Sequence, residues 1–369
     1  MKKIILICLL FFCASCHAYA IDVSADSACL ICADTGEIIY AKNEKERRTM
    51  ASTTKIMTGI LALENSEPSE IVAVSKNAER QEGTSIYLRE GERISMTDLV
   101  YGLMLNSGND AAVAIAEHVS GSVDKFAKKM NEKAAEIGAK NTSFKNPNGL
   151  DSEGHYTTAY DLALIGAYAM KNDKFREIVG TKSKTGRLDG GQILYFSNHN
   201  KLLNMYDGAV GIKTGFTKAS GRCLVSAAER EGVMLIAVTL NAPDDWNDHK
   251  KMLDFGFERI KPQIIVKKRQ ILKSRRVDGK KYNFLAEDNV TLSESGSNRF
   301  DVVLHMPENI PVPLNKGEKV GEGEVRFKGR TIAEFNIVSE EEIAEEGVKQ
   351  KKSFFACIDK AFKKMLNIS

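Results

Sequence analysis

The 369-residue sequence predicts an α+β fold, in which an antiparallel sheet carries an inserted cluster of helices and is followed by a small all-β domain and a terminal amphipathic helix. Strand-like alternation of apolar and polar residues stands at 28–39 and again at 210–241. Helical periodicity fills the interval between these segments. Beyond residue 260 the pattern changes to short alternating runs divided by polar turns. The length is sufficient for about two domains that each bury a core.

The elements of the first domain, expected at 21–260, follow from local patterns. The alternation at 28–39 indicates two short strands that turn at Asp34-Thr35-Gly36. Thr158 is a suitable N-cap for the last of the helices in the cluster. The helices are expected at 52–63, 96–106, 110–119, 123–137 and 158–170, the later strands at 210–216, 222–228 and 233–241, and a closing helix at 244–257.

The all-β domain is expected at 261–338, a plausible size for a small domain. It contains no pattern of a nucleophile beside a base, so we interpret it as a spacer or a binding module. Its strands are expected at 264–266, 282–286, 290–292, 300–304, 320–327 and 332–338.

Residues 1–20 are interpreted as a secretory signal. Lys2 and Lys3 precede an apolar run that is too short to span a bilayer as a helix. Ala18-Tyr19-Ala20 then supplies small residues for cleavage before Ile21. A lipoprotein anchor at Cys16 is the alternative, but the residues before it lack the usual leucine and small-residue pattern. We therefore expect the mature chain to be secreted across the cytoplasmic membrane.

Residues 339–369 are expected to form an acidic linker and an amphipathic helix. At 100° per residue, six apolar side chains fall within an arc of about 120°, and four lysines fall on the far side. The apolar residues are Phe354, Phe355, Ile358, Phe362, Met365 and Leu366, and the lysines are Lys352, Lys360, Lys363 and Lys364. A basic amphipathic helix of this kind lies in a membrane interface and attracts anionic headgroups. The prediction is a protein held peripherally on the outer face of the membrane. The alternative is a terminal helix docked on the protein itself.

Composition excludes several other kinds of partner. The formal net charge of +3 is too small to indicate nucleic acid. The histidines are scattered, and Cys29 and Cys32 lie in a strand-like run where residues three apart face opposite sides. That geometry disfavours a local disulfide and a shared metal ion, so the thiols are interpreted as small hydrophobic residues. We expect no metal site and no cofactor.

Three short motifs carry the candidate chemistry. In Ser52-x-x-Lys55, helical geometry brings the lysine amine beside the serine hydroxyl. A serine nucleophile needs such a base, and the lysine can serve only if desolvation or a neighbouring cation lowers its pKa. Ser107-x-Asn109 follows an apolar helix, at its exposed end, and a Lys-Thr-Gly triplet at 213–215 opens the later strands. This order of motifs is typical of penicillin-binding proteins and class A β-lactamases.

A second Lys-Thr-Gly triplet stands at 184–186. A polar turn follows it, and no strand is expected to continue from it. The triplet at 213–215 instead leads into apolar strands, where an edge strand could pair with the backbone of a peptide substrate. We therefore assign the third motif to 213–215.

Around these motifs the sequence resembles the serine D-alanyl-D-alanine carboxypeptidases, which are low-molecular-mass penicillin-binding proteins. The resemblance is dense from 21 to 262, and the all-β domain and terminal helix match the family's layout more loosely. It implies a β-lactamase/transpeptidase-like first domain that removes the last D-alanine of peptidoglycan stem pentapeptides. It also implies covalent inhibition by β-lactams. The similar blocks are 51–58, 107–112, 146–150, 155–163 and 198–203.

The resemblance implies roles for the catalytic residues. Ser52 would attack the carbonyl of the penultimate D-alanine, and Lys55 would be the base. Ser107 would relay a proton to the leaving amine, with Lys213 close enough to perturb both. The sequence leaves open which of the two lysines is the true base.

The same resemblance implies the substrate-binding groups. Asn109 would hold the peptide carbonyl of the substrate or the lysines. The backbone N–H groups of Ser52 and Phe216, beside Gly215, would form the oxyanion hole. Thr214 and Thr217 would receive the terminal carboxylate.

The chain also departs from the family pattern. Met50 stands where many relatives have proline, and Val210 where aspartate is frequent. Some relatives bind the carboxylate with an arginine near 242–250, but this segment contains none. His155 and His199 lie in family-like blocks and are interpreted as structural.

A class A-like β-lactamase is one alternative function. It requires a deacylating glutamate in an E-x-x-L-N setting, which none of the glutamates between the second and third motifs has. A catalytically silent cell-wall-binding protein is the other, and the presence of all the reactive residues argues against it.

Overall fold

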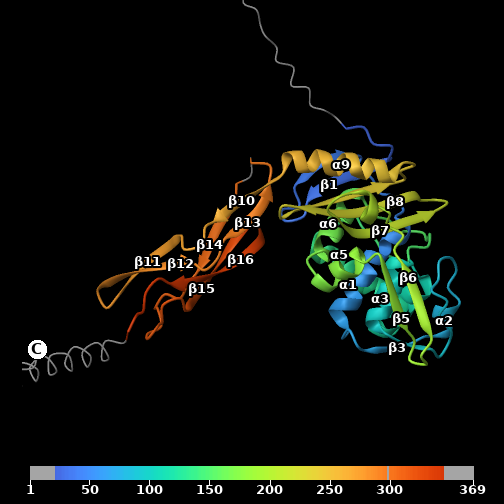
Figure 1. The fold of residues 1–369 in the computed structure, drawn as a ribbon, viewed down its shortest axis with the longest axis horizontal. Helices are drawn as coiled ribbons and strands as arrows, with labels where there is room; N and C mark the ends of the chain where they lie inside the picture. The colour runs from blue at the N-terminus through green and yellow to red at the C-terminus, as the bar shows by residue number, and fades with distance from the viewer. Residues whose placement is uncertain (1–20, 297–298, 345–369) are drawn as a thin grey trace, which may run out of the picture.

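A computed structural model describes residues 21–296 and 299–344 as a large domain and an elongated small domain (Figure 1). The expected signal at 1–20 and the expected amphipathic helix within 345–369 lie outside the described residues. No helix in the described part of the chain is long and apolar enough to cross a membrane. Nor do the described residues contain a group of His, Cys, Asp and Glu side chains that could hold a metal ion.

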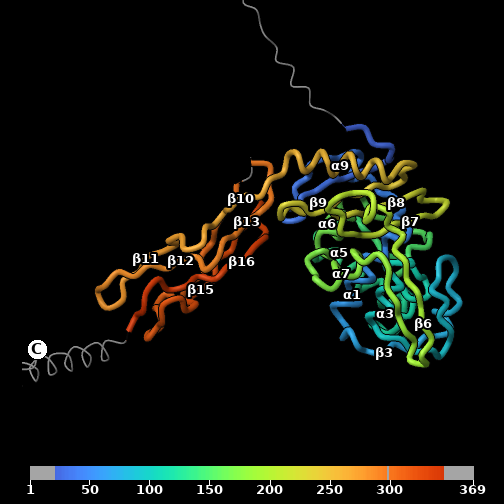
Figure 2. The backbone as a smooth tube through the Cα atoms, in the orientation of Figure 1, coloured from blue at the N-terminus to red at the C-terminus, as the bar shows by residue number. Residues whose placement is uncertain are grey.

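The large domain is built on an antiparallel sheet of order β2-β1-β9-β8-β7. The N-terminal hairpin of β1 and β2 completes a sheet whose other strands come late in the chain, as Figure 2 shows. Ser27 in β1 pairs with Leu240 in β9. The bounds are Ser27–Cys32 for β1, Ile38–Lys42 for β2, Ala209–Thr217 for β7, Gly221–Arg230 for β8 and Val233–Leu240 for β9.

Both faces of this sheet are buried. Alternate β1 residues belong to separate cores, with Cys29 on one side and Cys32 on the other. Both thiols are buried and free, as expected from their opposite orientation. Helix α6 (Ala159–Ala169) packs on β1 and β9 from the side of the helical cluster, and α9 (Asp245–Arg259) covers the other face.

Helix α1 (Lys55–Asn65) is central to the helical cluster, because it contacts α3 (Met96–Leu105), α4 (Asn109–Ser120), α6 and strand β7. The hydroxyl of Thr158 accepts a hydrogen bond from the Asp161 N–H and caps α6 as predicted. The expected helix at 52–63 instead begins with a 3₁₀ turn, Ala51–Thr54, before α1. The other helices are α2 (Lys76–Glu79), α5 (Val123–Ile137), α7 (Asp173–Gly180) and α8 (Leu202–Met205).

The second Lys-Thr-Gly triplet, at 184–186, forms part of a strand, contrary to the prediction. It lies within strand β5 (Ser183–Arg187), which pairs with β6 (Ile193–Ser197), although no strand was expected there. The hairpin is stabilised by Phe196, which is buried against Gly186 and Gly102. Most side chains of β5 and β6 are exposed, so the sequence lacks the run of apolar residues that would have predicted these strands. A smaller hairpin joins β3 (Ile71–Ala73) to β4 (Arg93–Ser95).

The small domain is all-β, as predicted. Its larger sheet has the order β11-β12-β16-β15-β14, and β10 pairs separately with β13. Strand β11 was not predicted, because this edge strand is rich in charged residues and only partly buried. The bounds are Lys261–Val266 for β10, Ile271–Val277 for β11, Lys280–Ala286 for β12, Val290–Glu294 for β13, Asp301–His305 for β14, Lys319–Phe327 for β15 and Arg330–Ser339 for β16.

The two domains meet where β13 approaches the turn between β1 and β2. The Ser293 N–H donates to Asp34 Oδ2 at 3.0 Å, and the Cys32 thiol donates to the Ser293 carbonyl at 3.1 Å. The contact joins the small domain to strand β1 of the five-stranded sheet and to the turn that follows it.

Candidate active site

The site is organised around the turn that carries Ser52. Ala51 has a positive φ of 47°, and the hydroxyl of Thr54 donates to the Ala51 carbonyl at 2.9 Å. The turn feeds directly into α1, whose first residue is Lys55. The amine of Lys55 lies 2.9 Å from Ser52 Oγ, as the spacing of the first motif predicts.

Lys55 is buried and held by polar groups from distant parts of the chain. Its amine donates to Asn109 Oδ1 at 2.7 Å and to the Asn148 carbonyl at 2.6 Å. Burial lowers the pKa of Lys55 well below its usual value, and the nearby Lys213 lowers it further. The neutral amine has two hydrogens for these two acceptors. Its lone pair is then available to the hydroxyl of Ser52.

Lys213 lies in β7 and is also buried. Its amine donates to the Thr214 carbonyl at 2.9 Å. Burial lowers the pKa of Lys213 to about 7. A proton can therefore leave or join this amine at neutral pH, and its charge acts on Lys55 nearby.

The second motif lies between α3 and α4. It was expected at an exposed helix end, but Ser107 is only 5 % exposed and Asn109 only 4 %. The segment is covered by the loop at 82–88, because Asn109 N–H donates to the Thr84 carbonyl and Asp110 accepts from the Ile86 and Leu88 N–H groups. This loop brings Thr84 to the wall of the cleft.

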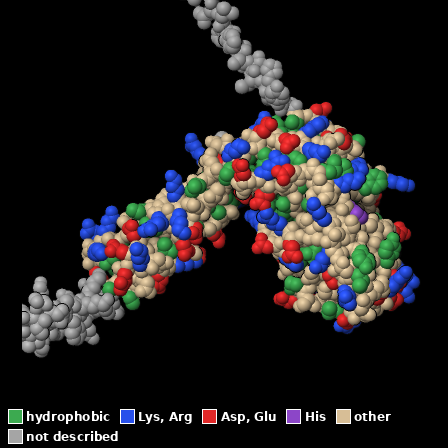
Figure 3. All heavy atoms as spheres, in the orientation of Figure 1, with side chains coloured by type: hydrophobic (Ala, Val, Ile, Leu, Met, Phe, Trp, Pro, Cys, Tyr) green, Lys and Arg blue, Asp and Glu red, His purple; other side chains and the backbone are tan. Residues whose placement is uncertain are grey.

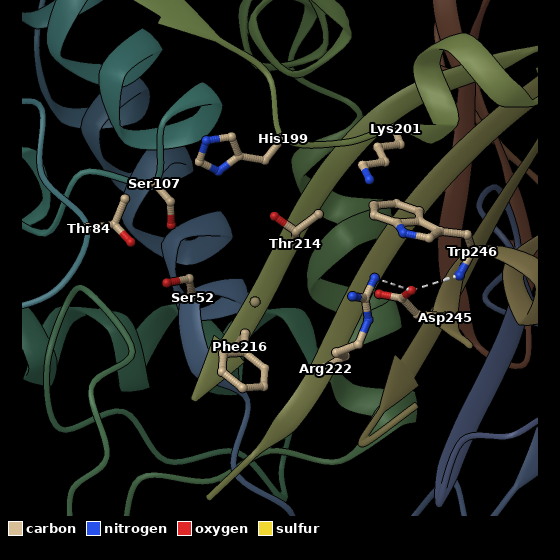
Figure 4. A pocket seen from close by; sticks show the side chains of 11 residues that line it. Ser52, Thr84, Ser107, His199, Lys201, Thr214, Phe216, Arg222, Asp245 and Trp246 are labelled. Atoms are coloured by element: carbon tan, nitrogen blue, oxygen red, sulfur yellow. Dashed lines mark hydrogen bonds and ion pairs between the residues drawn. The ribbon is translucent and has the colours of Figure 1, made fainter. Parts of the chain in front are cut away.

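These residues surround a cavity of about 520 Å³, shown in Figure 4. Several of the predicted site residues line it, while Lys55, Asn109 and Lys213 are buried beside it. The described residues that line the cavity are Ser52, Thr84, Ser107, His199, Lys201, Thr214, Gly215, Phe216, Arg222, Asp245 and Trp246.

Gly215 allows β7 to approach the nucleophile. A Cβ atom at this position would lie 3.0 Å from Ser52 N and 3.1 Å from Thr53 N, which is closer than ordinary packing permits. Strand β7 is an edge of its sheet, so part of its backbone is free to pair with an extended peptide. The cleft thus has the free edge of a strand beside the Ser52 N–H.

Thr217 does not fit its expected role. It is not among the described residues that line the cavity. Its hydroxyl donates to Asp151 Oδ1 at 3.1 Å and accepts from the Ser220 N–H at 3.0 Å. Residues in a strand alternate in direction, so Thr217 does not share the face of Thr214 and Phe216.

Sequence reasoning missed one side of the cavity, formed by Arg222, Asp245 and Trp246. Arg222 Nη2 donates to Asp245 Oδ1 at 2.6 Å, and its guanidinium carbon lies 5.7 Å from the centre of the Trp246 ring. Arg222 is opposite Phe216 in the β7–β8 register. The sequence signal for Arg222 is weak, because no motif surrounds it and the register of β7 and β8 is needed to place it beside Phe216.

The two histidines differ. His155 is buried, contacts the Thr54 hydroxyl at 2.9 Å and accepts from the Lys145 N–H at 3.0 Å, which supports the structural interpretation. Burial lowers its pKa to about 4. His199 instead lines the cavity, where partial desolvation and then the charge of Lys213 lower its pKa. Because His199 faces the cavity, it is placed to contact a bound ligand, and its prediction as a structural residue is incomplete.

Comparison with known proteins gives matches along most of the chain. A sequence model described as D-alanyl-D-alanine carboxypeptidase, a peptidase family, matches residues 14–244. A second, described as the C-terminal domain of penicillin-binding protein 5, matches residues 261–345. The D-alanyl-D-alanine carboxypeptidase DacF of Bacillus subtilis is 36% identical over 337 residues, which cover 88% of this chain and 87% of that protein. DacC of Escherichia coli is 30% identical over 342 residues, covering 85% and 82%.

Solved structures are also similar. Penicillin-binding protein 5 from Haemophilus influenzae superposes with a TM-score of 0.65 at 27% identity, over 88% of this chain and 99% of that one. The Streptomyces K15 DD-transpeptidase gives a TM-score of 0.62 at 33% identity, over 64% of this chain and 98% of that one. The likeness therefore extends from the motifs to the whole described architecture.

Proposed function

Because the chain belongs to the D-alanyl-D-alanine carboxypeptidase family of serine peptidases, we propose that it removes the terminal D-alanine from peptidoglycan stem pentapeptides through an acyl-enzyme on Ser52. One observation carries the proposal. The Ser52 hydroxyl lies 2.9 Å from the amine of Lys55, and burial lowers the pKa of that amine well below its usual value, which favours the neutral form that accepts a proton.

The reaction begins when Lys55 takes the hydroxyl proton and Ser52 Oγ bonds to the carbonyl carbon of the penultimate D-alanine. The negative charge passes to the carbonyl oxygen, which the N–H groups of Ser52 and Phe216 stabilise. Each donor of this kind contributes about 3–4 kcal/mol to the transition state. The close approach of Gly215 to Ser52 N supports this pairing of donors.

Collapse of the tetrahedral intermediate breaks the peptide bond. The leaving nitrogen takes a proton through the Ser107 hydroxyl, and Lys213, with its pKa near 7, replenishes that proton. D-alanine departs and leaves an ester on Ser52. Water then adds to the ester carbonyl and loses a proton, which passes through the Ser107 hydroxyl to Lys213 and restores that amine. The serine recovers its own proton from Lys55 as the shortened stem peptide leaves.

The lining of the cavity favours this function over a β-lactamase. Class A β-lactamases deacylate with a glutamate that is free to activate water. Asp245 is the carboxylate among the described lining residues, and it is already paired with Arg222. The glutamates that precede the third motif, Glu117, Glu132, Glu136, Glu153 and Glu177, are not among those lining residues.

The test combines a stem pentapeptide with a fluorescent penicillin. We expect release of one D-alanine per peptide and a stable label on the wild-type chain, and neither with Ser52→Ala. Rapid loss of the label would indicate a β-lactamase. A chain that takes no label and releases no D-alanine would be a silent binding protein.

The proposed location is the outer face of the cytoplasmic membrane, after export by residues 1–20 and attachment by the helix expected at 353–369. One observation supports a spacer role for the small domain. The described chain ends at its far end from the catalytic domain (Figure 1). Deletion of 353–369 should move the processed protein from the membrane fraction to the soluble fraction. Retention in the membrane fraction would contradict the anchor.

A further inference from the structure

We propose that Arg222, oriented by Asp245, binds the free carboxylate of the substrate's C-terminal residue. This inference rests on the proposed function and adds the residue that restricts the enzyme to chain ends. No residue on strand β8 was assigned this role from the sequence.

An enzyme that releases a single C-terminal residue must recognise a carboxylate next to the scissile bond. In a partly enclosed cleft, a carboxylate needs a cation or several hydrogen-bond donors. Lys55 and Lys213 are poor permanent cations, because burial lowers the pKa of both amines. Thr217, one of the expected carboxylate ligands, is engaged with Asp151 and Ser220.

Arg222 and Lys201 are the cationic side chains among the described lining residues. An arginine stays charged at any physiological pH and binds a carboxylate with two parallel hydrogen bonds. Lys201 is exposed and offers a mobile point charge at the rim. Arg222 is therefore the better candidate for precise recognition.

The sheet register places Arg222 beside the substrate-binding strand. It pairs with Phe216, so its side chain rises from the same face of the sheet as Phe216 and Thr214. Figure 4 shows Thr214 between the two serines on one side and the arginine on the other. A C-terminal residue bound past Ser52 and Thr214 would extend toward the guanidinium.

Asp245 and Trp246 hold the guanidinium in place. The Asp245 side chain is 4 % exposed, and its Oδ1 accepts from Arg222 at 2.6 Å and from the Trp246 N–H at 2.9 Å. The hydrogen bond to Asp245 uses only some of the five N–H donors of the Arg222 guanidinium. The Arg222 side chain is 43 % exposed, which leaves the remaining N–H groups accessible from the cavity. Asp245 is thus a positioning residue, and Trp246 limits the space beside it.

The experiment compares a stem pentapeptide that ends in a free carboxylate with the same peptide ending in a neutral amide. The wild type should strongly prefer the acid. Arg222→Gln should lower kcat/KM for the acid by about 10- to 100-fold, the range of a lost charge-assisted contact, and leave kcat/KM for the amide nearly unchanged. Arg222→Lys should retain part of the preference. Asp245→Asn should raise KM for the acid with less effect on kcat.

Arg230→Gln is the matched control, because Arg230 lies on the same strand but contacts Tyr206 and Phe257 away from the cavity. It should keep the wild-type preference. Thermal unfolding verifies that each variant is folded, and added guanidinium ion should partly restore Arg222→Ala. An Arg222→Gln enzyme that still prefers the acid as strongly as the wild type would overturn the inference and leave the proposed function intact. A wild type that releases no D-alanine would overturn the proposed function itself.

Discussion

The carbonyl oxygen of Asn148 lies 2.6 Å from the amine of Lys55 and fixes the direction in which that amine can act. Asn148 comes from a loop far along the chain from the nucleophile. Together with Asn109 Oδ1, it occupies both hydrogens of a neutral amine. The lone pair then has one remaining partner, the hydroxyl of Ser52. The base is therefore oriented before any substrate arrives.

Replacing Lys55 by arginine should abolish acylation. An arginine keeps its proton at any pH that the protein survives, so it cannot act as the base. We expect the second-order rate constant for labelling by fluorescent penicillin to fall by about 10³-fold or more. Loss of a general base typically lowers a rate by about 10²- to 10⁴-fold. Lys184→Arg, in the other Lys-Thr-Gly triplet, is the control and should label normally. Rapid labelling of Lys55→Arg would contradict the assignment of the base.

Gly149→Ala should disrupt the support of Lys55. Gly149 has a φ of +88°, and an added Cβ would lie 1.9 Å from the Ala51 carbonyl oxygen. To relieve this clash, the backbone must move both in the loop of Asn148, which binds Lys55, and in the turn that carries Ser52. We therefore expect the free energy of unfolding to fall by about 4 kcal/mol or more. Gly190→Ala has no heavy atom within 4 Å of the new Cβ and should change stability by about 0.5 kcal/mol or less. Urea unfolding of the pair measures the difference, and equal stabilities would contradict the argument.

Asp110→Asn should loosen the wall of the cleft. The carboxylate accepts from the Ser85 hydroxyl and from the backbone N–H groups of Ile86 and Leu88. An amide nitrogen would face some of these donors, so we expect a loss of about 2–3 kcal/mol in the free energy of unfolding and an increased KM. Asp254→Asn is the control, because its carboxylate is exposed. A variant with unchanged KM and unchanged stability would show that the loop does not depend on Asp110.

Acid should destabilise the protein through His249. The ring is buried between the hydroxyls of Ser226 and Thr239, and burial lowers its pKa to about 3. The unfolded chain binds the proton near the ordinary pKa of about 6.5, so this contribution to stability is complete above that pH and is lost as pH falls toward 3. The slope should reach about 1.4 kcal/mol per pH unit from this group. Urea unfolding at several pH values should show a smaller slope for His249→Gln, and parallel curves would contradict the prediction.

The elements with local signals were predictable, and those fixed by distant contacts were not. Strands β7, β8 and β9 and helix α5 have clear periodicity, and they lie close to their expected positions. Strand β5 depends on Phe196 packing against Gly102, a contact between distant segments. The burial of Ser107 was missed for the same reason, because it depends on the loop held by Asp110.

The site was predictable wherever chemistry is encoded in a motif. The pairing of Ser52 with Lys55 follows from helical spacing. Arg222 was missed because no motif surrounds it, and its role depends on Asp245 from helix α9, which lies beyond strand β9 in the chain. Thr217 was assigned by analogy, but its hydroxyl is satisfied by Asp151. Such assignments require the cross-strand register and the partners of each polar atom.

The pairing of Ser27 with Leu240 has a consequence for the timing of maturation. The first described strand, β1, is an interior one. Its neighbour β2 follows at once, but its other neighbour, β9, arrives only after the whole helical cluster has been made. Until β9 is made, the hairpin of β1 and β2 cannot pair with the rest of the sheet. The cleft beside β7 then lacks the complete sheet that supports it. A chain cut short before β9 should therefore be both unstable and unreactive, even though it carries every residue of the three motifs.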